Sequence, residues 1–95
     1  IEFLVHAQTQ RNARALGMFD RGALVPGMRA DINLIDFEKL DLTTPQVVHD
    51  LPAGGRRLVQ HAKGYVATLV NGQVVMQAGE ATGALPGKLV RSAQA

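Results

Sequence analysis

The hydrophobic positions of this chain change their period once, near Gly17. Before that point Ile1, Leu4 and Val5 recur at the three- and four-residue spacing of a helix. We therefore expect residues 1–19 to be helical. Gly17 is the expected C′ residue, because glycine enters the left-handed region without a steric penalty.

Thr9 leaves two possibilities within this segment. It can act as the N-cap of a second short helix that runs from Asn12 to Leu16, since a threonine hydroxyl accepts a hydrogen bond from a free amide in the first turn. Alternatively, one helix runs through Thr9. The sequence does not decide between them.

Beyond the helix the pattern becomes that of strands and turns. Residues 23–25 predict a short strand, and Pro26-Gly27 suits the centre of a type II turn. Residues 30–36 alternate between two faces and predict the next strand, which residues 40–42 could extend after a bend.

Residues 43–64 predict a long irregular connection. A brief strand at 56–59 is the only regular element expected there. A connection of this length in a compact domain usually covers something or carries function. The prediction rests on the residues that break regular elements, which are Pro45, Pro52, Gly54, Gly55 and Gly64.

Asn71-Gly72 gives the strongest local signal. Residues 65–70 and 73–77 flank it as alternating strands, and Asn-Gly is the preferred pair for a type I′ hairpin turn. Residues 81–91 predict a loop with at most one edge strand. Together the elements predict an α+β fold, an N-terminal helix followed by a small, mostly antiparallel sheet with unpaired edges.

Composition bounds the domain without naming a function. The chain has 95 residues, 46% of them hydrophobic, which predicts one domain with one modest core. Ten Lys or Arg oppose eight Asp or Glu, so the net charge of +2 does not favour nucleic acid or a membrane surface as a partner. No aromatic cluster suggests a base-stacking or sugar-binding surface.

The absence of cysteine excludes disulfides, thiolate zinc sites and a cysteine nucleophile. No apolar run approaches the roughly 20 residues that span a bilayer. The first residues from Ile1 have no positive region or cleavage site, so we do not expect a signal peptide, and we expect a cytoplasmic location. A chain that opens within a helical pattern is expected to be a piece of something longer.

The three histidines show no metal-site spacing. His6 falls in the helix, and His49 and His61 lie 12 residues apart in the expected loop, whereas zinc sites commonly draw on His-x-His or His-x₃-His. We expect no metal site from this chain alone. His49 and Asp50 are adjacent, so an extended backbone points them to opposite faces and no direct pair is expected.

Gly54-Gly55-Arg56-Arg57 is the best candidate for a functional loop. Glycines beside cations can form an anion nest, although a tight turn with solvated arginines explains the same residues. Ser92 has no nucleophile elbow around it, and the carboxylates are scattered. We assign no catalytic, cofactor-binding or metal-ligating residue in this chain.

Four stretches of the sequence carry a family resemblance. The stretch from Asn12 to Gly17, followed by Asp20 to Ile32 with its Gly-x-Leu-x-Pro-Gly-x-x-Ala-Asp pattern, resembles the C-terminal end of metal-dependent amidohydrolases. Residues 70–80 are similar to the closing hairpin of the same region. Residues 48–60 and 82–91 are similar to the branch of N-acyl-D-amino-acid deacylases (D-aminoacylases).

The resemblance implies a divided protein. Residues 1–19 would be the terminal helix of a (β/α)₈ barrel, and residues 20–95 would be the C-terminal part of an accessory β-sandwich assembled from both chain ends, with the long loop at 43–64. The family's metal ligands precede the last barrel helix, so none falls in this sequence. The missing barrel and N-terminal strands would be the partners of this segment, and zinc would belong to the parent enzyme.

Three hypotheses follow. The first is a non-catalytic C-terminal segment of an amidohydrolase that cleaves an amide of N-acyl-D-amino acids. The second is a free-standing β-rich module whose exposed sheet edge pairs with another copy or a partner strand. The third is a regulatory anion-binding domain that uses residues 54–57.

Overall fold

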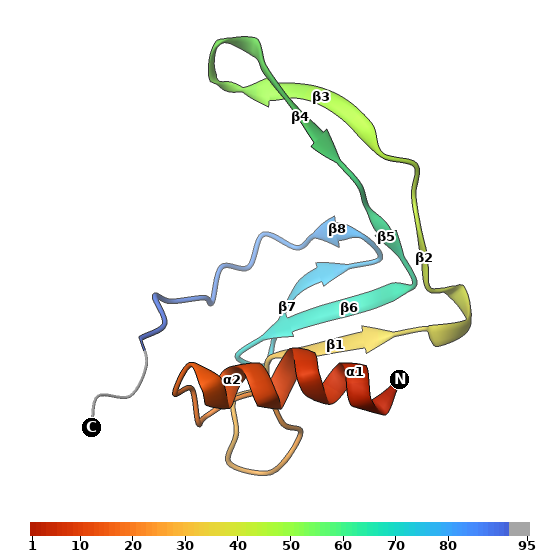
Figure 1. The fold of residues 1–95 in the computed structure, drawn as a ribbon. Helices are drawn as coiled ribbons and strands as arrows, with labels where there is room; N and C mark the ends of the chain where they lie inside the picture. The colour runs from red at the N-terminus through yellow and green to blue at the C-terminus, as the bar shows by residue number, and fades with distance from the viewer. Residues whose placement is uncertain (92–95) are drawn as a thin grey trace.

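The computed structural model describes residues 1–91, and its first element is one continuous helix (Figure 1). Thr9 lies in its middle, and the Thr9 hydroxyl donates a hydrogen bond to the carbonyl of Val5 at 2.6 Å. This bond to the preceding turn shows that Thr9 does not cap a second helix, so the helix runs through it. The parts of the helix are α1 (Glu2–His6), a π-helical turn (Ala7–Arg11) and α2 (Asn12–Ala15).

Gly17 ends the helix as predicted. Its φ of 71° lies in the left-handed region. The Gly17 amide donates to the carbonyl of Arg14 at 3.1 Å, and the Met18 amide donates to the carbonyl of Ala13 at 2.8 Å. These are the two bonds of a Schellman cap, so the last residues of the predicted helical segment 1–19 form the cap instead of another turn.

The loop after the cap contains no strand at residues 23–25, so that prediction is wrong. The loop closes on itself, because the Arg29 amide donates to the carbonyl of Asp20 at 2.7 Å. Leu24 is 78% exposed. A short apolar run cannot form a strand when no neighbouring strand lies beside it to share hydrogen bonds.

Two glycines set the course of this loop. Gly27 has a φ of 90°, and the Met28 amide donates to the carbonyl of Val25 at 3.2 Å, which is the predicted type II turn. Gly22 has a φ of 91° and lies directly against the helix. A Cβ at Gly22 would meet the Cα of Gln10 at 2.9 Å, so the close approach of loop and helix requires glycine.

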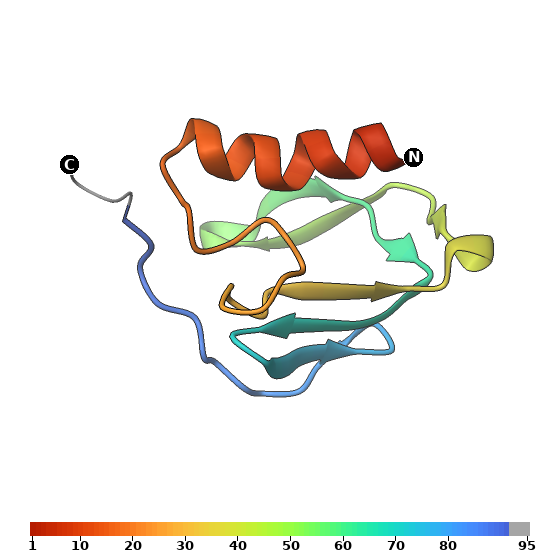
Figure 2. The same ribbon diagram turned by 90° about the horizontal axis from the view of Figure 1, so that it is seen from below.

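The main sheet has four antiparallel strands in the order β1-β6-β7-β8. Asn33 of β1 lies opposite Thr68 of β6, and the Thr68 hydroxyl donates to the Asn33 side chain at 2.9 Å. The helix followed by this sheet confirms the α+β prediction (Figures 1 and 2). The strands are β1 (Ile32–Ile35), β6 (Tyr65–Val70), β7 (Gln73–Gln77) and β8 (Glu80–Ala81).

The predicted hairpin turn joins β6 to β7. Asn71 and Gly72 have φ values of 50° and 78°, as a type I′ turn requires, and Val70 pairs with Gln73 across it. The tail after residue 81 has no further strand among the described residues, which agrees with the predicted loop.

A second, two-stranded ladder extends beyond the main sheet. The strand β2 (Asp41–Leu42) follows a 3₁₀ turn (Phe37–Lys39) and pairs with β5 (Ala62–Lys63). The bend predicted before residues 40–42 is therefore present. Gly64 closes this ladder with a φ of 94°, and a Cβ there would lie 2.7 Å from the Cα of Leu40.

Of the long irregular connection predicted for residues 43–64, only the brief strand at 56–59 is confirmed, and the irregular connection itself is wrong. It is mostly a hairpin, in which β3 (Gln46–Leu51) pairs with β4 (Gly55–Val59). A short 3₁₀ turn (Pro52–Gly54) joins the strands, and Ala53 and Gly54 adopt φ values of 59° and 72° there. The residues that suggested a loop therefore sit at the ends of strands, where they reverse the chain. Figure 1 shows this hairpin extending away from the main sheet.

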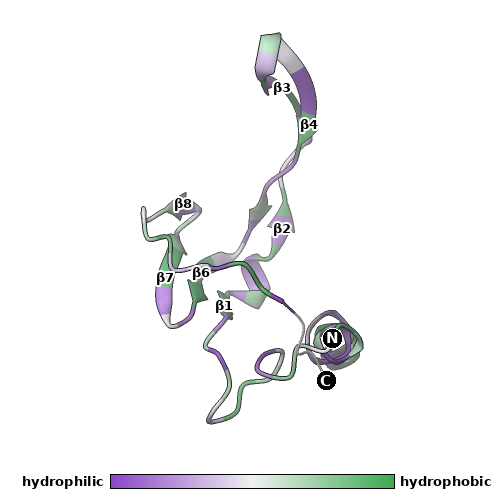
Figure 3. Ribbon diagram, turned by 90° about the vertical axis from the view of Figure 1, so that its left-hand side faces the viewer, coloured by the Kyte–Doolittle hydropathy of each residue, from purple (hydrophilic) through white to green (hydrophobic). Residues whose placement is uncertain are grey.

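Composition predicted one modest hydrophobic core, but the described residues enclose none. Ala13 is the one hydrophobic side chain among them that is buried. The chain exposes 7995 Å² of surface, whereas a compact protein of this mass exposes about 5300 Å². Its radius of gyration is 15.9 Å, against about 12 Å for a compact domain of this length. Figure 3 shows hydrophobic positions on the helix and on strands of both hairpins.

Candidate functional site

Four charged side chains from the loop after the helix form one network. The Asp20 carboxylate accepts from the Arg21 Nε at 3.1 Å and from the Arg29 Nε at 2.5 Å. The Arg21 Nη1 in turn donates to the Asp31 carboxylate at 3.3 Å. The turn at Gly27 makes this network possible, since it folds Arg29 back beside Asp20.

The network shifts the ionisation of its members. Hydrogen bonds from Arg21 and Arg29 lower the pKa of Asp20 from 3.8 to about 2. The hydrogen bond to Asp20 also raises the pKa of Arg21. Both directions follow from stabilising the charged form of each group, so Asp20 stays ionised well into the acid range.

The same network is joined to the tip of the β6–β7 hairpin. The second oxygen of Asp31 accepts from the Asn71 amide at 2.9 Å, and the Gly72 amide donates to the carbonyl of Ala30 at 2.9 Å. The loop that packs on the helix is thereby fastened to the sheet. Its polar contacts have a positioning role that the sequence pattern did not reveal.

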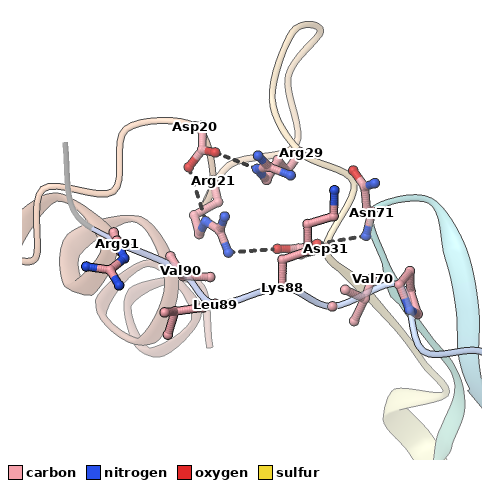
Figure 4. A pocket seen from close by; sticks show the side chains of 12 residues that line it. Asp20, Arg21, Arg29, Asp31, Val70, Asn71, Lys88, Leu89, Val90 and Arg91 are labelled. Carbon is pink, nitrogen blue, oxygen red and sulfur yellow. Dashed lines mark hydrogen bonds and ion pairs between the residues drawn. The ribbon is translucent and has the colours of Figure 1, made fainter.

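A cavity of about 370 Å³ opens beside this network (Figure 4). The loop at residues 20–31, which we call the charged loop, forms one wall of the cavity. The tip of the β6–β7 hairpin forms another wall, and the tail at residues 86–91 forms the third. The tail adds Lys88 and Arg91 to the lining. Three separate segments of the chain therefore line the cavity, and two of them, the loop and the tail, contribute its charged groups.

The histidines do not converge. His6 lies in α1, His49 in β3, and His61 just before β5. No three His, Cys, Asp or Glu side chains within residues 1–91 are grouped so as to hold a metal ion. The donor set of this part of the chain therefore does not fit a zinc site.

Asp50 pairs with an arginine across the β3–β4 hairpin. Arg57 donates through Nε and Nη2 to the two carboxylate oxygens at 2.7 Å and 2.6 Å. Hydrogen bonding between the two side chains lowers the pKa of Asp50 and raises that of Arg57. The bidentate geometry occupies Arg57, one of the two arginines that the sequence offered for an anion nest at 54–57. His49 is not the partner of Asp50.

Sequence reasoning missed the network because it treated the carboxylates as scattered. One signal could have found it: the type II turn between Asp20 and Arg29 brings residues nine apart to adjacent positions. The serine considered as a nucleophile, Ser92, lies outside the described residues.

Residues 1–76 match the family model described as "Amidohydrolase family". This match covers the helix, the charged loop, β1, the β2–β5 ladder, the β3–β4 hairpin and most of the β6–β7 hairpin. The chain belongs to the amidohydrolase family. The amidohydrolase resemblance inferred from the Pro-Gly-x-x-Ala-Asp loop is thus confirmed at the level of the family.

One curated relative is named as a 5-methylthioadenosine/S-adenosylhomocysteine deaminase, from Pelotomaculum thermopropionicum (strain DSM 13744 / JCM 10971 / SI). It is 44% identical over 69 residues, which are 73% of this amidohydrolase chain and 15% of the relative. The chain thus spans a small part of the relative's length. No solved structure matches the chain.

Among residues 1–91 no helix combines the length and the apolar character needed to span a membrane.

Proposed function

We propose that this chain is the non-catalytic C-terminal segment of a metal-dependent amidohydrolase whose parent cleaves the amide of N-acyl-D-amino acids. The observation that carries the proposal is the exposed apolar surface of a chain that belongs to the family. A segment whose core is missing is what remains when the larger part of a protein that covers it is absent.

The amount of exposed surface supports a large covering interface. The chain exposes about 2700 Å² more than a compact protein of its mass. Permanent interfaces bury about 2000 to 5000 Å² in total, counted over both partners. The extra exposed surface of this chain alone already reaches that size. We therefore infer that the partner that covers it is permanently bound, such as the rest of the same polypeptide.

The helix offers the clearest docking face. Gln10 and Ala13 face the charged loop, where Gly22 contacts them. Ile1, Leu4 and Val5 are all more than half exposed. An amphipathic helix buries its apolar side in a complete protein, so we assign this side to the barrel of the parent.

The choice of the D-aminoacylase branch rests on sequence blocks. Residues 48–60 form most of the β3–β4 hairpin and residues 82–91 form the tail, and both are similar to that branch. Zinc would supply a metal-activated water for amide hydrolysis. Its ligands would come from the barrel, and this chain would contribute packing and the accessory sheet.

The named relative favours a second candidate reaction. Its identity of 44% lies over 69 residues of the chain, and it is a deaminase by name. The parent could therefore release ammonia from 5-methylthioadenosine instead of cleaving an acyl amide. Both reactions leave this chain without a catalytic role.

Turnover by the full-length parent distinguishes these reactions. The full-length enzyme is assayed with zinc on N-acetyl-D-methionine, on its L enantiomer and on 5-methylthioadenosine. Release of D-methionine with little release of L-methionine supports the deacylase. Ammonia release from the nucleoside alone refutes it in favour of the deaminase.

The isolated 95-residue chain is the matched control. It is expected to show no turnover on any of the three substrates. Turnover by the chain alone would refute its non-catalytic role.

The alternative of a free-standing module rests on the sheet edges. β1 and β8 are the outer strands of the main sheet, so each has one side without a neighbouring strand among residues 1–91. Analytical ultracentrifugation of the chain tests this. A monomer at high concentration counts against edge pairing, whereas a dimer that binds no other part of an amidohydrolase supports it.

A further inference from the structure

The cavity beside the charged loop carries an excess of positive charge. Four cationic side chains and two carboxylates line it. The two carboxylates are already engaged by Arg21 and Arg29. Lys88 and Arg91 form no ion pair with any other group in residues 1–91. The charged side chains of the lining therefore carry a net charge of +2.

Hydrogen-bond donors also remain in the cavity. Arg29 meets Asp20 through Nε, and Arg21 uses Nε and Nη1, so each guanidinium keeps terminal N–H groups outside the network. The Lys88 ammonium adds three donors. Figure 4 shows Arg21, Arg29 and Lys88 around the same space, with the tail beneath them.

The size and chemistry of the space select a small ligand. Its volume of about 370 Å³ lies at the lower end of the range for small-molecule sites. No aromatic side chain lines it, so it offers no platform for a base or a sugar ring. Arginine forks and a lysine in one place match the oxygens of phosphate and carboxylate.

We propose that this cavity is an oxyanion-binding site that joins the charged loop, the β6–β7 hairpin tip and the tail. A bound oxyanion would hold the tail at Lys88 against the loop at Arg29. The anion has two possible sources, a free phosphate-like ion or a carboxylate side chain from the rest of the polypeptide. The site is separate from the reaction assigned to the parent, and its test needs no turnover.

Thermal unfolding of the full-length protein with inorganic phosphate tests the free-ion source. Phosphate is compared with chloride at equal ionic strength, which keeps general screening constant. The test variant is Lys88→Gln, because Lys88 has no ion pair to lose within residues 1–91. Lys63→Gln on β5 is the control, since Lys63 does not line the cavity.

For a free anion, phosphate raises the unfolding midpoint of the wild type and of Lys63→Gln. Lys88→Gln weakens the apparent phosphate affinity about tenfold, because the variant loses one charge-assisted hydrogen bond to the anion. For a carboxylate from the polypeptide, phosphate has no effect. Lys88→Gln then lowers the midpoint more than Lys63→Gln does, and high salt reduces that difference.

The proposal fails if phosphate has no specific effect and Lys88→Gln behaves like Lys63→Gln at low and high salt. It also fails if phosphate stabilises Lys88→Gln as strongly as the wild type. In both cases the positive charges of the cavity would be ordinary solvated side chains.

Discussion

Replacing Gly22 by alanine should open the contact between the charged loop and the helix. The new Cβ would lie 2.9 Å from the Cα of Gln10 and 3.0 Å from the Cβ of Ala13. Backbone cannot give way as a flexible side chain can. The residue also has a φ of 91°, which an L side chain rarely adopts.

Two costs add at this position. A non-glycine residue in a left-handed conformation loses about 1 to 2 kcal/mol. Forcing an extra methyl group into a filled contact costs about 1 to 3 kcal/mol more. Gly22→Ala should therefore destabilise the loop by about 2 to 5 kcal/mol.

Gly27→Ala is the matched control in the same loop. Gly27 has nearly the same φ, 90°, but a Cβ at this residue would meet no atom within 4 Å. It should lose only the conformational part, about 1 to 2 kcal/mol. The difference between the two variants isolates the contact with the helix.

Hydrogen exchange of the Gly17 and Met18 amides in the full-length protein measures this difference locally. Both amides form the cap at the end of the helix, where the loop begins. Gly22→Ala should lower their protection about 5- to 150-fold more than Gly27→Ala. Equal protection in the two variants would refute the contact as the reason for glycine at this position.

Three further predictions concern charge and turn geometry. Because the pKa of Asp20 falls from 3.8 to about 2 on folding, its contribution to stability is present above about pH 4 and is lost as pH falls towards 2; acid titration of unfolding should show a smaller loss in Asp20→Asn. NMR titration should show the lowered pKa of Asp50 rising towards its ordinary value in Arg57→Gln. It should not rise in Arg56→Gln, because Arg57 and not Arg56 donates hydrogen bonds to Asp50. Asn71→Ala should lower the unfolding midpoint and Asn71→Gly should largely preserve it, since the residue has a φ of 50°; equal losses would contradict the turn argument.

Local rules predicted the parts of the fold that depend on few residues. The cap at Gly17 and the type I′ turn at Asn71-Gly72 each follow from the φ that one or two positions require. The alternation in residues 65–70 and 73–77 follows from pairing across that turn. These elements need no information from distant parts of the chain.

The predictions that failed needed knowledge of neighbours. Residues 23–25 are apolar like a short strand but find no partner strand. Residues 46–59 contain strand breakers that end strands and reverse the chain. The modest core predicted from composition is absent because the apolar side chains face outward from the described residues. Composition counts apolar residues, but it does not say which molecule buries them.

The candidate site was only partly visible for the same reason. The Pro-Gly-x-x-Ala-Asp pattern indicated a family, and the match to residues 1–76 confirms it. The pattern did not indicate that Asp31 would bond to the hairpin tip 40 residues later, because that contact depends on how the loop meets the sheet.

Complementation tests most directly whether this chain is a non-catalytic part of a larger enzyme. The 95-residue chain and the rest of the proposed parent are produced as separate polypeptides and assayed apart and together for amide hydrolysis. We expect full activity only in the mixture, with the apolar helix face of the chain covered by the other part. Turnover by the 95-residue chain alone, or full activity and stability of the other part without it, would show that the chain is not a non-catalytic part of this enzyme.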